Sequence, residues 1–570
     1  MRIASACLSL AVAASAGCAT TPSAEPAANA MPATAATLAV PAIARPQGED
    51  ARWWFRNGAA QAAARGAGSA RAKNIILFVG DGMGVTTVSA ARIFEGQRQG
   101  HPGEEHLLAW EGFPATALSR TYNTDAQTPD SAGTMTAMST GAKTRMGVIA
   151  VAQSAARGDC AASRQAPLLT LWQLAADAGM ATGVVTTTRV THATPAATFA
   201  HSPERNWESD ADLDAGARAG GCIDIARQLV ESDHGNGPDV LLGGGRSNFM
   251  TTGQADPEYA DKTGVRTDGR DLIAQWKARH PEGAYVWNAR QLAQAPAGAP
   301  LLGLFERGHM QYEHDRPRDP GGEPSLAEMT RAAISRLQRN PQGYVLLVEG
   351  GRIDHAHHAG NAFRALADTA AMSDAVRVAD EMTSDADTLI VVTADHSHTL
   401  HFAGYPVRGN PILGKVMGGS GEAGEPGKLA LDATGKPYTT LGYANGPGYA
   451  GATDDAPEGV KSVASGSRGF RPALGGRPDL TAIDTTGPDY LQEATMPMGS
   501  ETHGGEDVGV WARGPGSTAF RGSIEQNTLF HLMLQAQPHL RAALCDAGLC
   551  EQEVPVVLPD PARFAMPARR

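Results

Sequence analysis

The chain has 570 residues, a length that would allow about three or four domains, although large α/β folds often keep such a chain in one unit. Its formal net charge of -12 argues against a nucleic-acid-binding protein, because such a protein carries a basic face. An anionic substrate would therefore need local positive charge from metal ions or arginine. The excess of histidine (17) over cysteine (6) favours sites built from imidazole and carboxylate rather than thiolate clusters.

The N-terminus predicts export. Met1 and Arg2 precede an apolar stretch and the sequence Ser15-Ala16-Gly17-Cys18, so we predict a signal peptide over residues 1–17, too short to span a bilayer. The small residues before Cys18 predict a lipid anchor on that cysteine, and ordinary cleavage after residues 14–16 is the alternative. The predicted location is the periplasm, as a soluble or lipid-anchored protein. Residues 18–47, rich in Ala, Pro and Thr, predict a flexible linker.

Four cysteines follow the linker, and an even number in an exported chain predicts disulfides. Three pairings are possible in principle. The short gap between Cys545 and Cys550 favours a local bridge, which leaves Cys160 to pair with Cys222. No later segment is apolar enough to be transmembrane, and the arginines at the C-terminus exclude a hydrophobic anchor tail.

Short apolar runs alternate with amphipathic stretches along most of the chain. Continuous β-branched runs of this kind predict strands buried on both faces. They lie at residues 74–80, 182–188, 239–245, 344–350 and 388–395, and the helical patterns include residues 168–180 and 325–339. This alternation predicts a three-layer α/β/α sandwich with a largely parallel central sheet, formed by residues 48–404 and 501–550.

Residues 405–500 differ in composition, being rich in Gly, Pro, Ser, Asp and Thr without a sustained period. A disordered loop is one interpretation. The aromatic residues within 438–451 favour a small, irregular folded insertion instead, because disordered segments tend to lack them. Residues 551–570 are predicted to form a C-terminal tail.

Three predicted strands end in an acid: Asp81, Glu349 and Asp395. In open α/β sheets the carboxyl ends of the strands form the ligand crevice, so these side chains could converge. Gathered carboxylates repel one another, and a divalent metal ion is the usual remedy. The glycines of residues 79–85 do not form the GxGxxG pattern of a dinucleotide site.

Histidines accompany two of these acids. Asp354 and His358 are four residues apart, so on a helical turn they share one face and can bind one ion. Asp395 and His396 are adjacent and can share an ion only where the strand breaks. His398 could be a further ligand or a supporting group, and the side chains that point elsewhere on the helical turn are those of His355 and His357.

Ser131 follows a Pro-Asp turn at the head of a helical pattern. The ordinary role of serine at such a place is an N-cap. As a nucleophile it would gain from the helix dipole and from a nearby metal ion. The chain has no GxSxG elbow, so a conventional hydrolase triad is not supported.

Taken in order, these motifs are similar to those of alkaline phosphatases: "NIILFVGDGMGV", "TPDSAGT", "RNWESDAD", "LLVEGGRIDHAHH", "VTADHSH" and "ETHGGEDV". The resemblance runs from about Ala51 to Cys550 and is closer to the vertebrate-like branch, whose crown domain would correspond to the insertion. It implies a homodimeric enzyme that hydrolyses phosphate monoesters at alkaline pH through a phosphoserine intermediate. The crown and residues 51–60 would contribute to the dimer interface.

The resemblance also implies a role for each matching residue. It predicts Ser131 as nucleophile, Arg205 as phosphate clamp, two zinc ions and one magnesium ion. The first zinc would be bound by Asp354, His358 and His503, the second by Asp81, Asp395 and His396, and the magnesium by Asp81, Thr194 and Glu349.

Two further positions follow from the resemblance. His192 lies near the magnesium ligands where other bacterial members have Asp, and a neutral imidazole there would weaken the negative field around that ion. A structural calcium ion, as in the vertebrate-like branch, would be bound by Glu258, the Phe305 carbonyl, Glu306 and Asp319.

Two other functions remain open. A phosphodiesterase or sulfatase of the same superfamily is one, although residues 131–135 do not fit the C/S-x-P-x-R setting of sulfatases and diesterases usually have a threonine nucleophile. The other is a non-catalytic, metal-binding envelope protein that has kept the fold. The presence of the serine, the arginine and every expected ligand argues against it.

Overall fold

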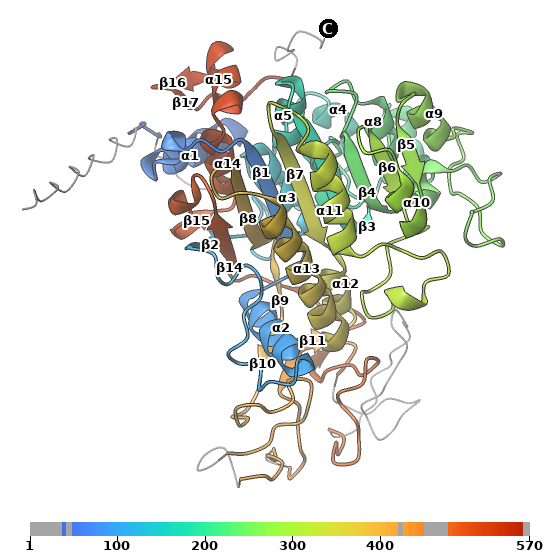
Figure 1. Cartoon of the computed structure of the whole chain (residues 1–570), viewed down its shortest axis with the longest axis vertical. Helices are drawn as coiled ribbons and strands as arrows, with labels where there is room; N and C mark the ends of the chain where they lie inside the picture. Colours follow the sequence, from blue (N-terminus) through green and yellow to red (C-terminus); the bar gives the residue numbers. More distant parts are fainter. Residues whose placement is uncertain (1–36, 42–47, 420–425, 433, 450–476, 562–570) are drawn as a thin grey trace, which may run out of the picture. The chain divides into compact units, whose positions relative to one another are not determined.

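The computed structural model describes residues 37–41, 48–419, 426–432, 434–449 and 477–561 (Figure 1). The predicted signal peptide, Cys18 and most of the predicted linker lie outside the described residues. Residues 37–41 lie beside helix α1 (Ala51–Ala64), where Trp53 Nε1 donates a hydrogen bond to the Pro41 carbonyl at 2.9 Å. Among the described residues, no helix is both long and apolar enough to cross a bilayer.

The main sheet has ten strands in the order β15-β2-β14-β8-β1-β7-β3-β4-β6-β5. Each of the five predicted strands is present and parallel to its neighbours in the order β8-β1-β7-β3-β4. Their bounds are β1 Asn74–Gly80, β3 Ala181–Arg189, β4 Val240–Gly244, β7 Tyr344–Gly350 and β8 Thr388–Ala394. Strand β14 (Val508–Arg513) is antiparallel to β8 and to β2 (Ala115–Arg120). The other strands of this sheet are β5 Ala284–Val286, β6 Leu301–Leu304 and β15 Gly522–Glu525.

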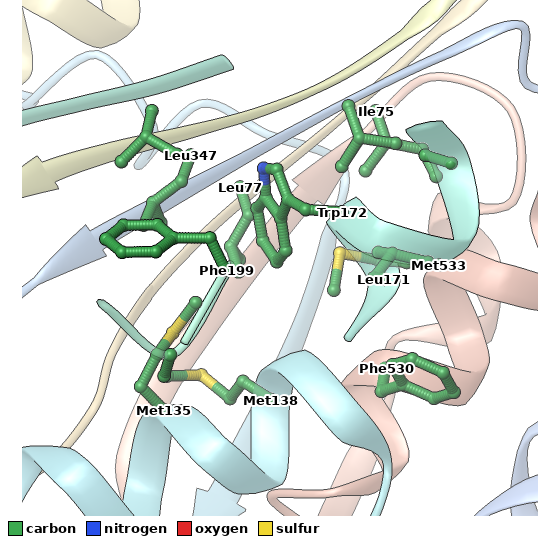
Figure 2. Packing of buried hydrophobic residues seen from close by; sticks show 14 of the residues in the cluster. Ile75, Leu77, Met135, Met138, Leu171, Trp172, Phe199, Leu347, Phe530 and Met533 are labelled. Carbon is green, nitrogen blue, oxygen red and sulfur yellow. The ribbon is translucent and has the colours of Figure 1, made fainter. Parts of the chain in front are cut away.

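Helices cover both faces of the sheet, because alternate side chains of each strand point to opposite faces. Ile75 and Leu77 of β1 belong to one apolar cluster, shown in part in Figure 2, with side chains from several helices. These helices include α1, α3 (Ser131–Thr140), α5 (Leu171–Asp177) and α14 (Thr528–Ala536). Ile76 and Phe78 belong to the second cluster, with α2 (Val85–Arg98), α11 (Leu326–Leu337) and α13 (Ala362–Met382). The predicted three-layer sandwich is therefore confirmed.

The remaining helices are short. They are α4 Cys160–Ser163, α6 Ala193–Ala196, α7 Ala215–Ala219, α8 Ile225–Glu231, α9 Leu272–Arg279, α10 Ala289–Gln294, α12 Arg352–His358 and α15 Pro538–Asp546. Of these, α12 carries the residues of the predicted Asp354–His358 turn, so that the expected helical spacing is present.

The insertion contains regular structure within its described part. Strands β11 (Leu441–Gly446) and β12 (Ala494–Pro497) lie within it and form a three-stranded sheet, in the order β10-β11-β12, with β10 (Leu400–Phe402), which precedes the insertion. Leu441 and Tyr443 of β11 are fully buried, so this strand packs into the second apolar cluster. The segment is thus folded around β11, as its aromatic residues indicate.

The structure joins Cys160 to Cys222 and Cys545 to Cys550, the pairing that the spacing favours. After Cys550 the chain forms a small hairpin of β16 (Cys550–Glu551) and β17 (Val554–Pro555). Glu551 accepts two hydrogen bonds from Arg56 of α1, both at 2.8 Å. The start of the predicted tail therefore packs against the N-terminal helix.

Candidate active site

The acids at the strand ends converge, as predicted. Asp81 follows β1, Glu349 lies at the end of β7, and Asp395 and His396 follow β8. Because β8, β1 and β7 are adjacent and parallel, their carboxyl ends meet at one edge of the sheet. The ligand atoms of Asp81, Asp395 and His396 all lie within 4.8 Å of one another, and so do those of Asp81, His192 and Glu349.

Ser131 is the first residue of α3 and does not cap it. The N-cap is Asp130, whose Oδ1 accepts a hydrogen bond from Gly133 N at 3.0 Å. The Ser131 hydroxyl is therefore free to face the acidic cluster, where its Oγ lies 3.4 Å from Asp81 Oδ1 and 3.2 Å from His396 Nε2. Asp130, which the sequence shows only as a turn residue, orients this serine by starting the helix.

Asp130 also holds Arg205 beside Ser131. Arg205 Nη1 donates to Asp130 Oδ2 at 2.9 Å, and Nη2 donates to His192 Nε2 at 3.1 Å. Burial disfavours the Asp130 carboxylate, but Arg205 and the backbone amides of Gly147 and Gly133 outweigh it, so the pKa of Asp130 is lowered. The guanidinium is thus fixed to Asp130, the residue before Ser131 at the start of α3.

A second group of ligands lies beside this one. Asp354 and His358 are on α12, and His503 is on β13 (His503–Gly504), which pairs with β9 (Ser397–His398). Asp354 Oδ1 is 3.3 Å from both His358 Nε2 and His503 Nε2, and these two nitrogens are 3.1 Å apart. The structure therefore brings together the three residues predicted for the first zinc ion.

The hydrogen bonds of Nδ1 set the tautomers of His358 and His503. His358 Nδ1 lies 2.6 Å from the Glu501 carbonyl, and His503 Nδ1 lies 2.8 Å from the Pro129 carbonyl. A carbonyl only accepts, so each Nδ1 must carry the proton and each Nε2 presents a lone pair to the cluster. Two lone pairs facing each other beside the Asp354 carboxylate fit a cation between them.

The third group contains buried polar atoms without a partner in the described structure: Asp81 Oδ2, His192 Nδ1, Thr194 Oγ1 and Glu349 Oε1. The other Glu349 oxygen accepts from the hydroxyls of Thr186 and Thr188. Buried oxygens that lack donors are costly unless a cation or water binds them. Their hard, oxygen-rich character fits the predicted magnesium ion.

His192 lies beside this group and accepts a hydrogen bond from Arg205. Arg205 can only donate, so His192 Nε2 must accept, and the proton of the neutral ring lies on Nδ1. Burial and then the Arg205 charge hold the pKa of His192 well below its ordinary value, so the ring is neutral. Its Nδ1–H has no hydrogen-bond partner in the described structure, and the ring lies near the carboxylates of Asp81 and Glu349.

The carboxylates of these groups are not balanced by nearby positive charges of the protein. Burial raises the pKa of Glu349 to about 7. Burial and the charges of Asp395, Asp354 and Glu349 raise the pKa of Asp81 well above its ordinary value. Protein groups alone therefore do not compensate the ionised carboxylates, and divalent cations would.

A fourth group of acids lies apart from Ser131. The ligand atoms of Glu258, Glu306 and Asp319 lie within 4.8 Å of one another, and Asp319 Oδ1 is buried without a partner in the described structure. Glu258 accepts from the buried Arg246 at 2.9 Å, and Glu306 accepts from the Tyr259 hydroxyl at 2.8 Å. Three carboxylates in this arrangement fit the predicted calcium ion. The remaining predicted ligand, the carbonyl of the buried residue Phe305, belongs to the residue before Glu306.

His398, which the sequence indicated as either a further ligand or a supporting group, has both nitrogens engaged: Nε2 lies 2.8 Å from Asp354 Oδ1 and Nδ1 lies 2.5 Å from Glu501 Oε2. It therefore holds Asp354 in place rather than binding a cation. Glu501 precedes His503 by two residues, and the sequence predicted no role for it.

Comparison with known proteins identifies the family. The family described as "Alkaline phosphatase" matches residues 72–538 of this chain. The chain belongs to the alkaline phosphatase family. It is 45% identical over 475 residues to the tissue-nonspecific isozyme of alkaline phosphatase from Gallus gallus, with 82% of this chain and 84% of that protein covered. Alkaline phosphatase of Gadus morhua is 44% identical, with 82% and 92% covered.

Solved structures of the family share the fold. Alkaline phosphatase from Thermus thermophilus gives a TM-score of 0.55 at 25% identity and covers 82% of this chain and 92% of its own. The enzyme from the Antarctic bacterium TAB5 gives a TM-score of 0.52 at 23% identity and covers 82% and 98%. The resemblance to the vertebrate enzymes is thus confirmed. The chain is a phosphomonoesterase that depends on divalent metal ions and acts, as the family does, through a phosphoserine intermediate.

Proposed function

We propose that Ser131 is the nucleophile of this phosphomonoesterase and that Arg205 clamps the phosphoryl group. One observation carries the proposal: the Ser131 hydroxyl lies 3.2 Å from His396 and 3.4 Å from Asp81, two residues of one ligand group, and Arg205 is hydrogen-bonded to Asp130, the residue before Ser131. A serine that served only as the N-cap would accept a hydrogen bond from a backbone amide of the first turn, and here Asp130 accepts that bond.

The reaction consists of two displacements at phosphorus. Ser131 Oγ forms a bond to phosphorus while the bond to the ester oxygen breaks, which releases the alcohol and leaves phosphoserine. Water then attacks the same phosphorus from the opposite side, the bond to Ser131 Oγ breaks, and inorganic phosphate leaves. Arg205 donates parallel hydrogen bonds to two nonbridging oxygens throughout, a geometry that its planar fork allows and that lysine lacks.

The predicted cations would be held as the three groups of ligands suggest. Asp354, His358 and His503 would bind one zinc ion, Asp81, Asp395 and His396 a second, and Asp81, Thr194 and Glu349 a magnesium ion. When bound, a pair of zinc ions in such a site lowers the pKa of the attacking hydroxyl or water and neutralises charge on the departing oxygen. The chain itself supplies the orientation, since each ligand histidine is anchored by a carbonyl on its far side.

A structural calcium ion at Glu258, Phe305, Glu306 and Asp319 is part of the proposal. Burial raises the pKa of Glu306, and the nearby acids add to the effect of burial in raising the pKa of Glu323 to about 9. Such an acidic group on connecting loops is stabilised when a cation binds it. The ion would fix the loops that surround it rather than take part in the reaction.

We also propose a homodimer, exported to the periplasm and either soluble or lipid-anchored at Cys18. Large apolar side chains are exposed near and within the insertion, including Phe402, Tyr405, Leu431 and Met496. These residues favour the insertion as the larger part of the interface. The apolar face of α1, by contrast, packs on α14 of the same chain, since Trp54, Phe55 and Ala59 are fully buried.

The decisive experiment is the variant Ser131→Ala. We expect it to bind the metal ions with wild-type stoichiometry and to lose nearly all hydrolysis of p-nitrophenyl phosphate. Unchanged turnover by this variant would refute the assignment of Ser131 as the nucleophile. Rates for a phosphate monoester, a phosphate diester and a sulfate ester, measured side by side on the wild type, should favour the monoester strongly. A preference for the diester or sulfate ester would revive the alternative activities.

A further inference from the structure

Two of the three histidines that follow Asp354 lack a role in the reaction, and His357 is the more completely enclosed. Its ring is fully buried, and both nitrogens have partners: Nδ1 lies 2.7 Å from the Tyr443 hydroxyl and Nε2 lies 3.0 Å from Thr87 Oγ1. With both nitrogens engaged, His357 is not available as a ligand. It instead connects helix α12 to the insertion on one side and to α2 on the other.

The ring of His357 also supports a neighbouring ring. It stacks on His398 with 4.8 Å between ring centroids and 30° between ring planes. His398 in turn lies 2.8 Å from Asp354 Oδ1. A change in the orientation of the His357 ring would therefore alter the position of the Asp354 carboxylate by two routes. One is the backbone of α12, and the other is the stacked His398 ring.

Strand β11 also contacts the chain segment that carries His503, the ligand that lies opposite Asp354 and His358. Asn445 Nδ2 donates to Thr502 Oγ1, and Thr502 N donates to Asn445 Oδ1, both at 3.0 Å. Thr502 directly precedes His503. Tyr443 and Asn445 are two residues apart on one strand, so their side chains share a face. One strand of the insertion thus binds α12 and the segment that carries His503.

We propose that Tyr443 is a positioning residue: through His357 it fixes α12 and the His398 ring, so that Asp354 and His358 meet His503 in the geometry that a cation requires. The physical reason is that metal affinity depends on ligand orientation, and groups behind the ligands set that orientation. The inference rests on the first metal site proposed above. It makes the insertion part of the catalytic apparatus, in addition to any role in assembly.

The variant Tyr443→Phe tests this, because it removes only the hydroxyl. Zinc affinity of the metal-free full-length protein is measured by competition with a chromophoric chelator, and the Co2+-loaded protein is examined by visible absorption. We expect the affinity of one zinc equivalent to fall about tenfold, as substitutions behind metal ligands do, and the cobalt bands of that site to shift. Neither readout depends on turnover.

Tyr490 provides the matched control. It is a tyrosine of the same insertion, buried to 2% exposure, and its hydroxyl has no partner in the described structure. Tyr490→Phe is therefore the same chemical change without the contact, and we expect wild-type zinc affinity and cobalt spectrum. If Tyr443→Phe and Tyr490→Phe give the same values, the inference is wrong.

If Tyr443→Phe does not fold, a second pair of variants tests the contact between His357 and Thr87 of α2. Thr87→Val removes the other hydrogen bond of His357, and Thr87→Ser keeps it. Zinc affinity should fall in the valine variant and recover in the serine variant. Equal affinity in the two variants would overturn the inference by this route.

A further variant separates this inference from the proposal on which it rests. Asp354→Asn should abolish binding of one zinc equivalent if the first site is correctly assigned. Retention of both zinc ions by Asp354→Asn would refute that site. Loss of zinc in Asp354→Asn with no effect of Tyr443→Phe would refute only the role of Tyr443.

Discussion

The guanidinium of Arg205 has five N–H groups, and the structure shows how they are divided. Nη1 gives one hydrogen to Asp130 Oδ2 at 2.9 Å and Nη2 gives one to His192 Nε2 at 3.1 Å. Each terminal nitrogen therefore keeps one hydrogen, and these two point from one rigid plane. Lysine has a single nitrogen and cannot satisfy Asp130, His192 and two phosphoryl oxygens at once.

Replacing Arg205 by Ala removes both bonds to the phosphoryl group, and replacing it by Lys removes one. A hydrogen bond to a charged group contributes about 1.5–3 kcal/mol, so the alanine variant should lose about 3–6 kcal/mol of transition-state stabilisation. This corresponds to a loss of about 10²- to 10⁴-fold in kcat/KM for p-nitrophenyl phosphate, and about 10- to 100-fold for the lysine variant. Steady-state kinetics at fixed zinc and magnesium concentrations provides the assay.

The order of the two variants is the sharper part of this prediction. If Arg205→Lys and Arg205→Ala lose kcat/KM equally, the prediction that lysine retains one of the two bonds is wrong, and the arginine acts only through its paired donors. If both variants stay within about threefold of the wild type, Arg205 does not contact the transferred group. Metal content should be measured in each variant, since His192 loses a partner in both.

Three other predictions concern the cations and buried groups. Removal of metal ions by a chelator should abolish turnover and lower the thermal unfolding midpoint, and zinc plus magnesium should restore both; an unchanged midpoint would contradict the charge imbalance around Asp81. Addition of calcium should raise the midpoint of the wild type and have no effect on Asp319→Asn, followed by calorimetry in the zinc-loaded enzyme. Burial lowers the pKa of His531 to about 3, against about 6.5 in the unfolded chain. Between these two pH values the unfolded chain binds a proton at this ring and the folded chain does not. The free energy of unfolding therefore decreases as the pH falls from about 6.5 toward 3. His531→Gln should reduce the slope of unfolding free energy over that range by up to about 1.4 kcal/mol per pH unit, measured by urea denaturation, and an identical slope in both proteins would refute it.

The central strands and the ligand acids could be predicted because both are local in sequence. A buried parallel strand is a continuous apolar run, and the acid that ends it marks the edge where ligands gather, as for Asp81 after β1 and Glu349 in β7. The strands beyond β8, on the antiparallel side of the sheet, were harder to predict. Strands β2 and β14 are mixed in pattern, and their pairing joins segments nearly 400 residues apart, as for Val510 and Ala117.

The roles of Asp130 and Glu501 could not be predicted from the sequence for a different reason. Each acts on a group far along the chain, and aspartate and glutamate also occur as caps, turn residues and surface charges. Nothing in the local pattern separates the Tyr443 hydroxyl, which reaches His357, from that of Tyr490, which reaches no partner in the described structure. Only the folded chain shows which partner each group meets.

The antiparallel strand β14 and the short strand β13 have a consequence for synthesis. His503 meets His358 across 145 residues of chain, and β14 completes the sheet between β8 and β2 only after residue 508 has been made. Ser131, Arg205 and the acids of β1, β7 and β8 are all made earlier. The chain therefore cannot bring together the full set of proposed ligands until nearly nine-tenths of it has been synthesised, so a chain released early would carry the proposed nucleophile without the first metal site.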